Sequence, residues 1–121
     1  MTKTVLTVDD SRTIRDMLRV TLSSAGYAVL QAEDGQQGLD MLGDAKPDVI
    51  ITDINMPRLD GYGFIAGVRA HGDLRAVPIL VLSTESDAEK KQRARAAGAT
   101  GWIVKPFDPA KLVDAVRRVA A

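Results

Sequence analysis

Five short apolar runs rich in β-branched residues alternate with segments of helical periodicity, and this alternation most narrowly limits how the chain can fold. The runs recur at intervals of 21 to 30 residues and begin near Val5, Ala28, Val49, Ile79 and Trp102. Each interval can hold a helix and two loops, as a crossover between parallel strands requires. The runs are continuous rather than alternating, which is typical of strands buried on both faces of a parallel sheet.

The intervening segments are predicted to be five helices. The first three are expected to end near Gly26, Gly43 and Gly72, and the fourth to span 87–97 with mostly Ala as its apolar content, so that it packs lightly. The fifth is expected to begin at Asp108, an N-cap candidate followed by Pro. With no linker or repeat, residues 1–121 are predicted to form a single doubly wound α/β domain.

Composition excludes several classes of protein. Sixteen basic and 16 acidic residues give a net charge of zero, which argues against a strongly basic nucleic-acid binder, and the absence of cysteine excludes thiolate chemistry. No apolar run approaches the ~20 residues of a membrane span, and no signal peptide precedes the first run, so a cytoplasmic protein is expected. Residues 1–60 carry 6 basic and 10 acidic side chains, and the second half reverses this balance. Either solvated surfaces vary, or an acidic pocket is built early and a basic partner-facing surface late.

Reactive side chains follow the ends of four predicted strands. Asp9 and Asp10 follow the first run, Asp53 the third, Ser83 closes the fourth, and Lys105 follows the fifth. Ligands of an open α/β sheet bind outside the carboxyl ends of its strands, so these residues are expected to meet at one site. Two carboxylates ~5 Å apart repel by about 3 kcal/mol at an effective dielectric near 20. A divalent cation would remove that repulsion, and an all-oxygen site suits Mg²⁺.

The chain resembles the receiver domain of two-component response regulators, and is most similar to the stand-alone chemotaxis (CheY) type. The resemblance rests on Asp9-Asp10, on Asp53 within DVIITDINMPRLDG, on Ser83 and on Lys105-Pro106-Phe107, and it covers nearly the whole chain. The intervals of 43, 30 and 22 residues between Asp10, Asp53, Ser83 and Lys105 are those of the family. It implies a flavodoxin-like sheet of five parallel strands in the order 2-1-3-4-5, with five helices.

The resemblance also implies the roles of the site residues. Asp53 would accept a phosphoryl group, with Lys105 and the metal absorbing charge on the transferring oxygens. Asp10, Asp53 and the main-chain carbonyl of Asn55 would bind Mg²⁺, with Mn²⁺ as an alternative, and Asp9 would act mainly through bound water. The Lys105-Pro106 bond is expected to be cis, although base rates for X–Pro bonds favour trans.

A second group of residues would transmit the phosphorylation signal. By similarity, the Ser83 hydroxyl would turn to the phosphoryl group and Trp102 would follow, which would remodel the fourth helix, fifth strand and fifth helix. The family more often has Tyr or Phe at the position of Trp102, and it commonly has Ala or Gly at the position of Thr84. Thr84 is expected to narrow access to Asp53. Asn55 and Glu85 either tune attack of water on the acyl phosphate or are plain solvated surface.

The expected partners follow from this assignment. A sensor histidine kinase of a chemotaxis system would be the phosphoryl donor, and a flagellar motor switch protein would be the target. The regulator is expected to be a monomer without an output domain, and to bind neither nucleic acid nor membrane. The basic residues of 87–97 either form an ordinary solvated face or bind an acidic partner; they are Lys90, Lys91, Arg93 and Arg95. The alternative is a phosphorelay intermediate or phosphate sink.

Enzymes of other classes fit less well. Gly61, Gly63 and Gly67 lack the GxGxxG spacing of a dinucleotide site, and no P-loop motif occurs. An aspartyl-phosphate hydrolase uses a similar residue set, but that class resembles DxDx[TV] at its nucleophile, whereas Ile54-Asn55 follow Asp53. The protein is therefore expected not to be an enzyme with an independent substrate.

Overall fold

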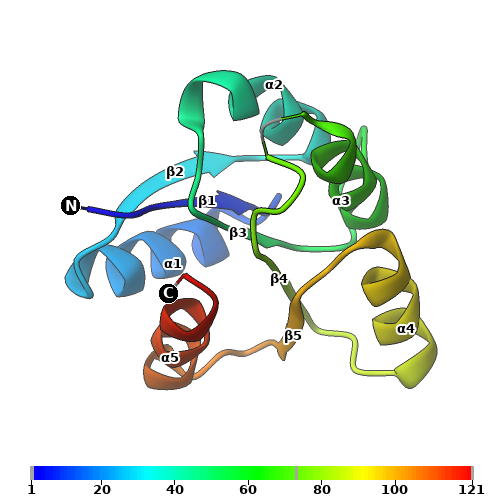
Figure 1. Ribbon diagram of the computed structural model, residues 1–121. Helices are drawn as coiled ribbons and strands as arrows, with labels where there is room; N and C mark the ends of the chain where they lie inside the picture. Colours follow the sequence, from blue (N-terminus) through cyan, green and yellow to red (C-terminus); the bar gives the residue numbers. More distant parts are fainter. Residues whose placement is uncertain (1, 73, 121) are drawn as a thin grey trace.

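A five-stranded parallel sheet forms the centre of the protein (Figure 1). The computed structural model describes residues 2–72 and 74–120. Hydrogen bonds join the strands in the order β2-β1-β3-β4-β5, which confirms the flavodoxin-like topology. The strands are β1 (Thr4–Val8), β2 (Ala28–Ala32), β3 (Val49–Thr52), β4 (Ile79–Ser83) and β5 (Gly101–Val104).

Five helices alternate with the strands, as predicted: α1 (Arg12–Ser24), α2 (Gly35–Ala45), α3 (Gly61–Ala70), α4 (Ala88–Ala97) and α5 (Pro109–Val119). Each begins after a residue whose side-chain oxygen accepts a hydrogen bond from an amide of the first turn, namely Ser11, Asp34, Asp60, Asp87 and Asp108. The predicted end of α2 before Gly43 is wrong. The helix continues to Ala45 and ends at Lys46, which has a left-handed conformation. A single glycine inside a helix costs only about 1 kcal/mol, so it does not stop one.

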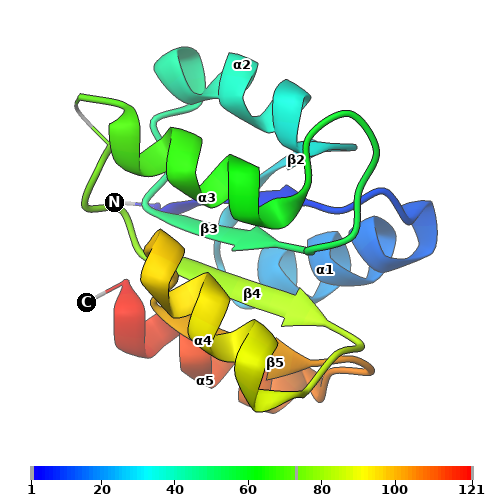
Figure 2. The same ribbon diagram turned by 90° about the vertical axis from the view of Figure 1, so that its right-hand side faces the viewer.

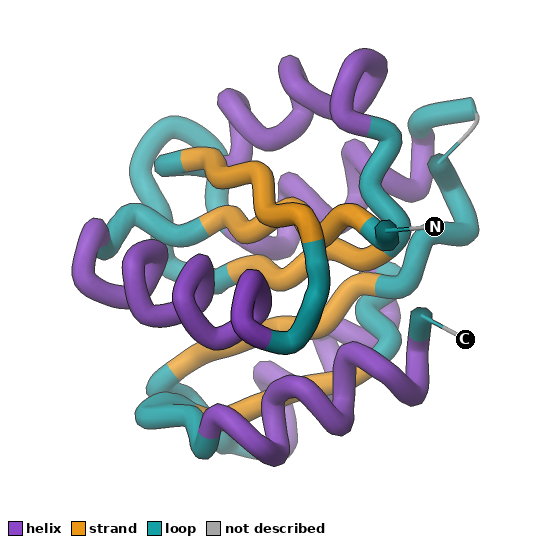
Figure 3. Tube along the Cα trace, turned by 90° about the vertical axis from the view of Figure 1, so that its left-hand side faces the viewer, coloured by secondary structure: helices purple, strands orange, loops and turns teal. Residues whose placement is uncertain are grey.

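The helices cover the two faces of the sheet unequally. Figure 2 shows α2, α3 and α4 on one face, with α1 and α5 behind the sheet. Figure 3 shows the opposite side, where α1 and α5 lie in front. Each face has its own apolar core: Phe64 and Ile65 are central to the first, and Leu22 and Leu112 to the second. The crossovers therefore place the carboxyl ends of all five strands, and the loops that follow them, at one edge of the molecule.

Burial along the strands follows their place in the sheet. β1, β3 and β4 are almost wholly buried, as the continuous apolar runs predicted. The same prediction is wrong for β2 and β5, which lie at the edges of the sheet and have a neighbouring strand on one side only: Leu30 and Val104 are 38% and 42% exposed. In α4, Ala94 is the buried residue, so the expected light packing of this helix is confirmed. No helix in the described residues is long and apolar enough to cross a membrane.

Candidate functional site

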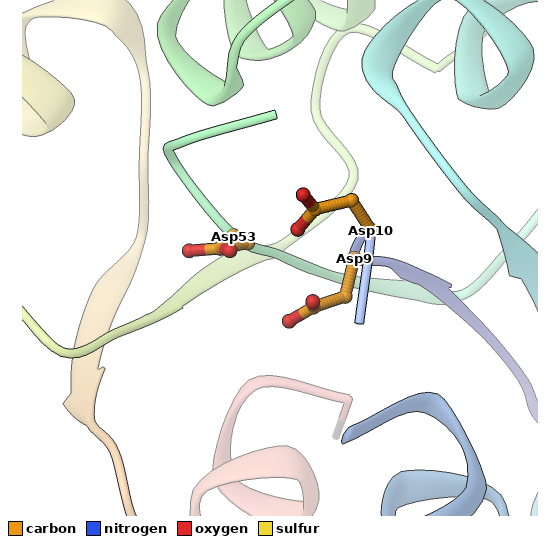
Figure 4. A group of neighbouring side chains, drawn as sticks. All are labelled: Asp9, Asp10 and Asp53. Atoms are coloured by element: carbon orange, nitrogen blue, oxygen red, sulfur yellow. The ribbon is translucent and has the colours of Figure 1, made fainter. Parts of the chain in front are cut away.

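Three carboxylates converge where β1 and β3 end. Asp9 and Asp10 directly follow β1, and Asp53 directly follows the adjacent strand β3. One oxygen from each lies within 4.8 Å of the others. Figure 4 shows the carboxyl groups of Asp9 and Asp10 extending from the end of β1 toward the side on which Asp53 lies. Asp9 is 1% and Asp53 8% exposed, whereas Asp10 faces solvent.

Lys105 brings a positive charge to this cluster from the far end of the sequence. Its Nζ lies 2.9 Å from Oδ2 of Asp9 and 3.4 Å from Oδ2 of Asp53. It follows β5, and the Lys105-Pro106 bond is cis, as the resemblance implied. The structure thus gathers Asp9, Asp10, Asp53 and Lys105 at one site, where the sequence placed them.

Hydrogen bonds fix two of the three carboxylates. The Ser11 amide donates to Oδ1 of Asp9 at 2.9 Å, and the Ile54 amide donates to Oδ1 of Asp53 at 2.8 Å. Both oxygens of Asp9 are therefore occupied, one by Ser11 and one by Lys105. Asp10 forms no salt bridge within residues 2–72 and 74–120. Asp10 is thus the carboxylate most available to a ligand from solution.

The charges at the site are only partly balanced. Burial, together with the nearby charge of Asp9, raises the pKa of Asp53, although Lys105 and the Ile54 amide act in the opposite direction. Burial alone would lower the pKa of Lys105, but its hydrogen bond to Asp9 and the charges of Asp9 and Asp53 outweigh burial and raise it. Lys105 thus contacts two of the three carboxylates, and the raised pKa of Asp53 means that its negative charge is disfavoured at this site.

This donor set fits a small divalent cation. Its oxygens are hard ligands, they come from three carboxylates, and one side of the site is open to water, which suits Mg²⁺ with its retained waters. Asn55 is exposed in the loop after β3. In the described part of the chain, its main-chain carbonyl accepts no hydrogen bond from a main-chain amide. That carbonyl is therefore free to act as a further oxygen ligand.

Ser83 and Trp102 are linked through the backbone of Glu85. The Glu85 amide donates to the fully buried Ser83 hydroxyl at 3.2 Å, and the Trp102 indole donates to the Glu85 carbonyl at 2.8 Å. Ser83 ends β4 and Trp102 lies on β5, so the loop between β4 and α4 connects two neighbouring strands. Thr84 is exposed in this loop. The sequence pattern did not indicate the Glu85 link, because it is made by main-chain atoms.

Polar contacts also hold the lightly packed helix α4. The Lys90 Nζ lies 2.9 Å from the Glu85 carboxylate, and the Arg93 guanidinium lies 3.9 Å above the centre of the Tyr62 ring. The basic residues of α4 are therefore not all plain solvated surface. Nothing in the sequence indicates that Tyr62, at the start of α3, would contact a residue of α4, so the Arg93–Tyr62 contact was not predicted.

Comparison with known proteins identifies the architecture. The model of the response regulator receiver domain matches residues 5–117. The chemotaxis protein CheY4 of Vibrio cholerae has 47% identity and a TM-score of 0.95, with 98% of this chain and 99% of that chain covered. The receiver domain of the sensor histidine kinase PA1611 from Pseudomonas aeruginosa, described with a magnesium ion coordinated in its active-site cleft, has 28% identity and a TM-score of 0.92, with 99% and 98% covered.

A curated relative of different description matches over the same region. "Probable transcriptional regulator ycf27" of Guillardia theta is 41% identical over 115 residues, which is 95% of this chain and 44% of that protein. The chain therefore spans about half the length of the curated relatives it matches. The match of fold, acidic site and nearly full-length family model leads to one assignment: the chain belongs to the response regulator receiver domain family.

Proposed function

We propose that the protein is a phosphorylation-controlled signalling switch that accepts a phosphoryl group on Asp53 from a sensor histidine kinase. The observation that carries this proposal is the position of the buried Asp53 carboxylate, with Lys105 at 3.4 Å and two further carboxylates within 4.8 Å. A switch of this kind modifies itself and needs no independent substrate, so we propose that it is not an enzyme in its own right.

Phosphoryl transfer would use the residues as follows. An oxygen of Asp53 attacks phosphorus in line with the P–N bond of the donor phosphohistidine; that bond breaks, and its electron pair stays on the imidazole nitrogen. Lys105 pairs with the developing charge on the transferring oxygens. When bound by Asp10, Asp53 and the Asn55 carbonyl, Mg²⁺ supplies charge neutralisation at the same oxygens. Asp9 orients this assembly through its bonds to Lys105 and Ser11.

The response is proposed to pass through the Ser83–Glu85–Trp102 link. The phosphorylated aspartate is a new acceptor for the Ser83 hydroxyl, and a turn of that hydroxyl would weaken its bond with the Glu85 amide. The Glu85 carbonyl holds the Trp102 indole, so this change would shift the population of β5 and α4 conformations. The remodelled surface comprises α4, β5 and α5.

The partner of that surface is proposed to be a protein of the chemotaxis system, most simply the flagellar motor switch, bound by a monomer in the cytoplasm. CheY4, described as a chemotaxis protein, supports this choice because it matches over 98% of this chain and 99% of its own. The curated relatives that are transcriptional regulators support another output for the same receiver switch. A phosphorelay intermediate or phosphate sink would share the Asp53 chemistry without binding an effector.

Binding to the flagellar switch protein tests the choice of partner. The protein activated with Mg²⁺ and beryllofluoride, a phosphoryl analogue, should bind it more tightly than Asp53→Asn does. Charge reversal at Lys91 and Arg95 should weaken binding and leave phosphorylation intact, while Arg19→Glu on α1 serves as the matched control. Phosphorylation with no activation-dependent binding would instead favour the relay or sink.

A further inference from the structure

Arg15 reaches from α1 to the turn that carries two of the carboxylates. Its Nη1 donates to the main-chain carbonyl of Asp9 at 2.7 Å, and its side chain is only 13% exposed. Asp9 also contributes its side chain to the acidic cluster. The next peptide nitrogen belongs to Asp10, so a single bond from Arg15 restrains the peptide group between both acids.

The Asp9 carbonyl lies just where the support of the sheet ends. β1 ends at Val8, whose carbonyl accepts from the Asp53 amide at 2.9 Å, and the Asp9 amide donates to Ala32 at 3.1 Å. Among the residues described, no main-chain amide outside the regular elements donates to the Asp9 carbonyl. Arg15 therefore supplies the bond that a neighbouring strand supplies one residue earlier.

Arg15 is itself held at two points, its guanidinium group and its main-chain carbonyl. Its Nη2 lies 3.7 Å from the exposed carboxylate of Glu33, in the loop after β2. The Gln31 side chain donates to the main-chain carbonyl of Arg15 at 2.6 Å and contacts the Thr7 hydroxyl at 3.3 Å. These contacts tie the start of α1 to β1 and β2, so the position of Arg15 is set before any ligand binds.

We propose that Arg15 is a positioning residue for cation binding, which acts by fixing the Asp9–Asp10 peptide and thereby the directions of both carboxylates. The inference rests on the proposed Mg²⁺ site and adds a determinant that touches neither the metal nor phosphate. Groups that orient metal ligands commonly alter affinity by 10–100-fold, although they form no bond to the metal. A buried cation near the site should by itself weaken cation binding, so a positioning role and a purely electrostatic role predict opposite effects.

The test compares Arg15→Met, which keeps most of the apolar stem, with Arg19→Met, one turn later on α1. Arg19 is 56% exposed and bonds only to Asp16 among the residues described, so both substitutions remove one charge from the same helix. Calorimetric titration with Mg²⁺ should give a dissociation constant about 10-fold higher for Arg15→Met and within twofold of wild type for Arg19→Met. Arg15→Lys should recover part of the loss.

A second readout is independent of the metal. In Mg²⁺-free protein, the NMR amide resonance of Asp10 should shift in Arg15→Met and stay in place in Arg19→Met. Should Arg15→Met fail to fold, Arg15→Lys keeps the positive charge but lacks the second guanidinium nitrogen, and its Asp10 amide resonance should still differ from that of wild type. Unchanged or tighter Mg²⁺ binding in Arg15→Met would overturn the inference. If the wild-type protein does not bind Mg²⁺, the proposed metal site is wrong, and the Asp10 resonance still decides whether Arg15 fixes the peptide.

Discussion

The Lys105 ammonium lies 2.9 Å from a carboxylate oxygen of Asp9, although 96 residues separate the two in the sequence. The parallel sheet makes this possible, since every strand delivers its carboxyl end to the same edge. Lys105 also lies 3.4 Å from Asp53, so it compensates two carboxylates at once. Its substitution should therefore separate cation binding from phosphoryl transfer.

Lys105→Met should slow phosphorylation of Asp53 by about 10²–10³-fold, the usual cost of removing one donor to a developing anion. Mg²⁺ binding should be as tight or tighter, because a competing positive charge has been removed. Stopped-flow phosphorylation by a small-molecule phosphoryl donor and a calorimetric Mg²⁺ titration measure the two effects. Lys91→Met on α4 is the matched control. Equal losses in both quantities would mean that Lys105 merely maintains the fold.

Asp53→Asn should stabilise the Mg²⁺-free protein at neutral pH. Burial raises the folded-state pKa of Asp53 above its ordinary value of 3.8. At pH values between the pKa of Asp53 in the unfolded state and its higher pKa in the folded state, the folded state binds more protons. The free energy of unfolding therefore falls as the pH rises through that interval. The variant should have the higher melting temperature at pH 7, with no advantage below pH 3.8.

The matched control for this comparison is Asp40→Asn, an exposed carboxylate on α2. It should show no comparable gain at pH 7. Saturating Mg²⁺ should reduce the difference between wild type and Asp53→Asn, because the cation relieves the repulsion in the wild-type site. A lower melting temperature of Asp53→Asn at pH 7 without metal would contradict the assigned balance of charges.

Gly61→Ala should destabilise the protein by about 1–3 kcal/mol, the usual cost of overpacking. A Cβ at Gly61 would overlap the main-chain carbonyl of Asp53 and lie 2.7 Å from Cα of Ile54. Gly43→Ala is the control: nothing lies within 4 Å of its Cβ, and this helical position should gain about 0.5–1 kcal/mol. Urea unfolding measures both. An equal response of the two glycines would show that α3 does not pack against the Asp53 backbone.

Trp102 reports on the proposed switch. Beryllofluoride with Mg²⁺ should change its fluorescence in wild type, because its indole bonds to the Glu85 carbonyl in the loop that starts at the Ser83 hydroxyl. The change should be absent in Asp53→Asn and smaller in Ser83→Ala. A wild-type spectrum that stays constant while the analogue binds would argue against coupling at Trp102.

Much of this architecture follows from patterns within the sequence. The apolar runs predicted five parallel strands, and Asp9, Asp53 and Lys105 could be placed at one edge because the carboxyl ends of such strands must meet there. The exposure of β2 and β5 depends on which strands lie at the edges. Sequence periodicity does not report strand order, which came from the family resemblance.

Contacts made by main-chain atoms or by long flexible side chains could not be predicted. The Trp102–Glu85 bond and the Arg15–Asp9 bond both end on carbonyl groups, which every residue possesses. The end of α2 was also misplaced, since Gly43 can either stop a helix or lie within one. In the structure the helix ends three residues later, where Lys46 adopts the left-handed conformation, and the local sequence does not distinguish these two outcomes.

The most direct test of the central claim is intact-protein mass spectrometry after incubation with a small-molecule phosphoryl donor and Mg²⁺. Wild type should gain the mass of one phosphoryl group, on Asp53, in an acid-stable and base-labile linkage, and Asp53→Asn should gain none while Asp40→Asn behaves as wild type. Phosphorylation that persists in Asp53→Asn, or continuous release of phosphate from a phosphorylated metabolite without labelling of the protein, would contradict the switch.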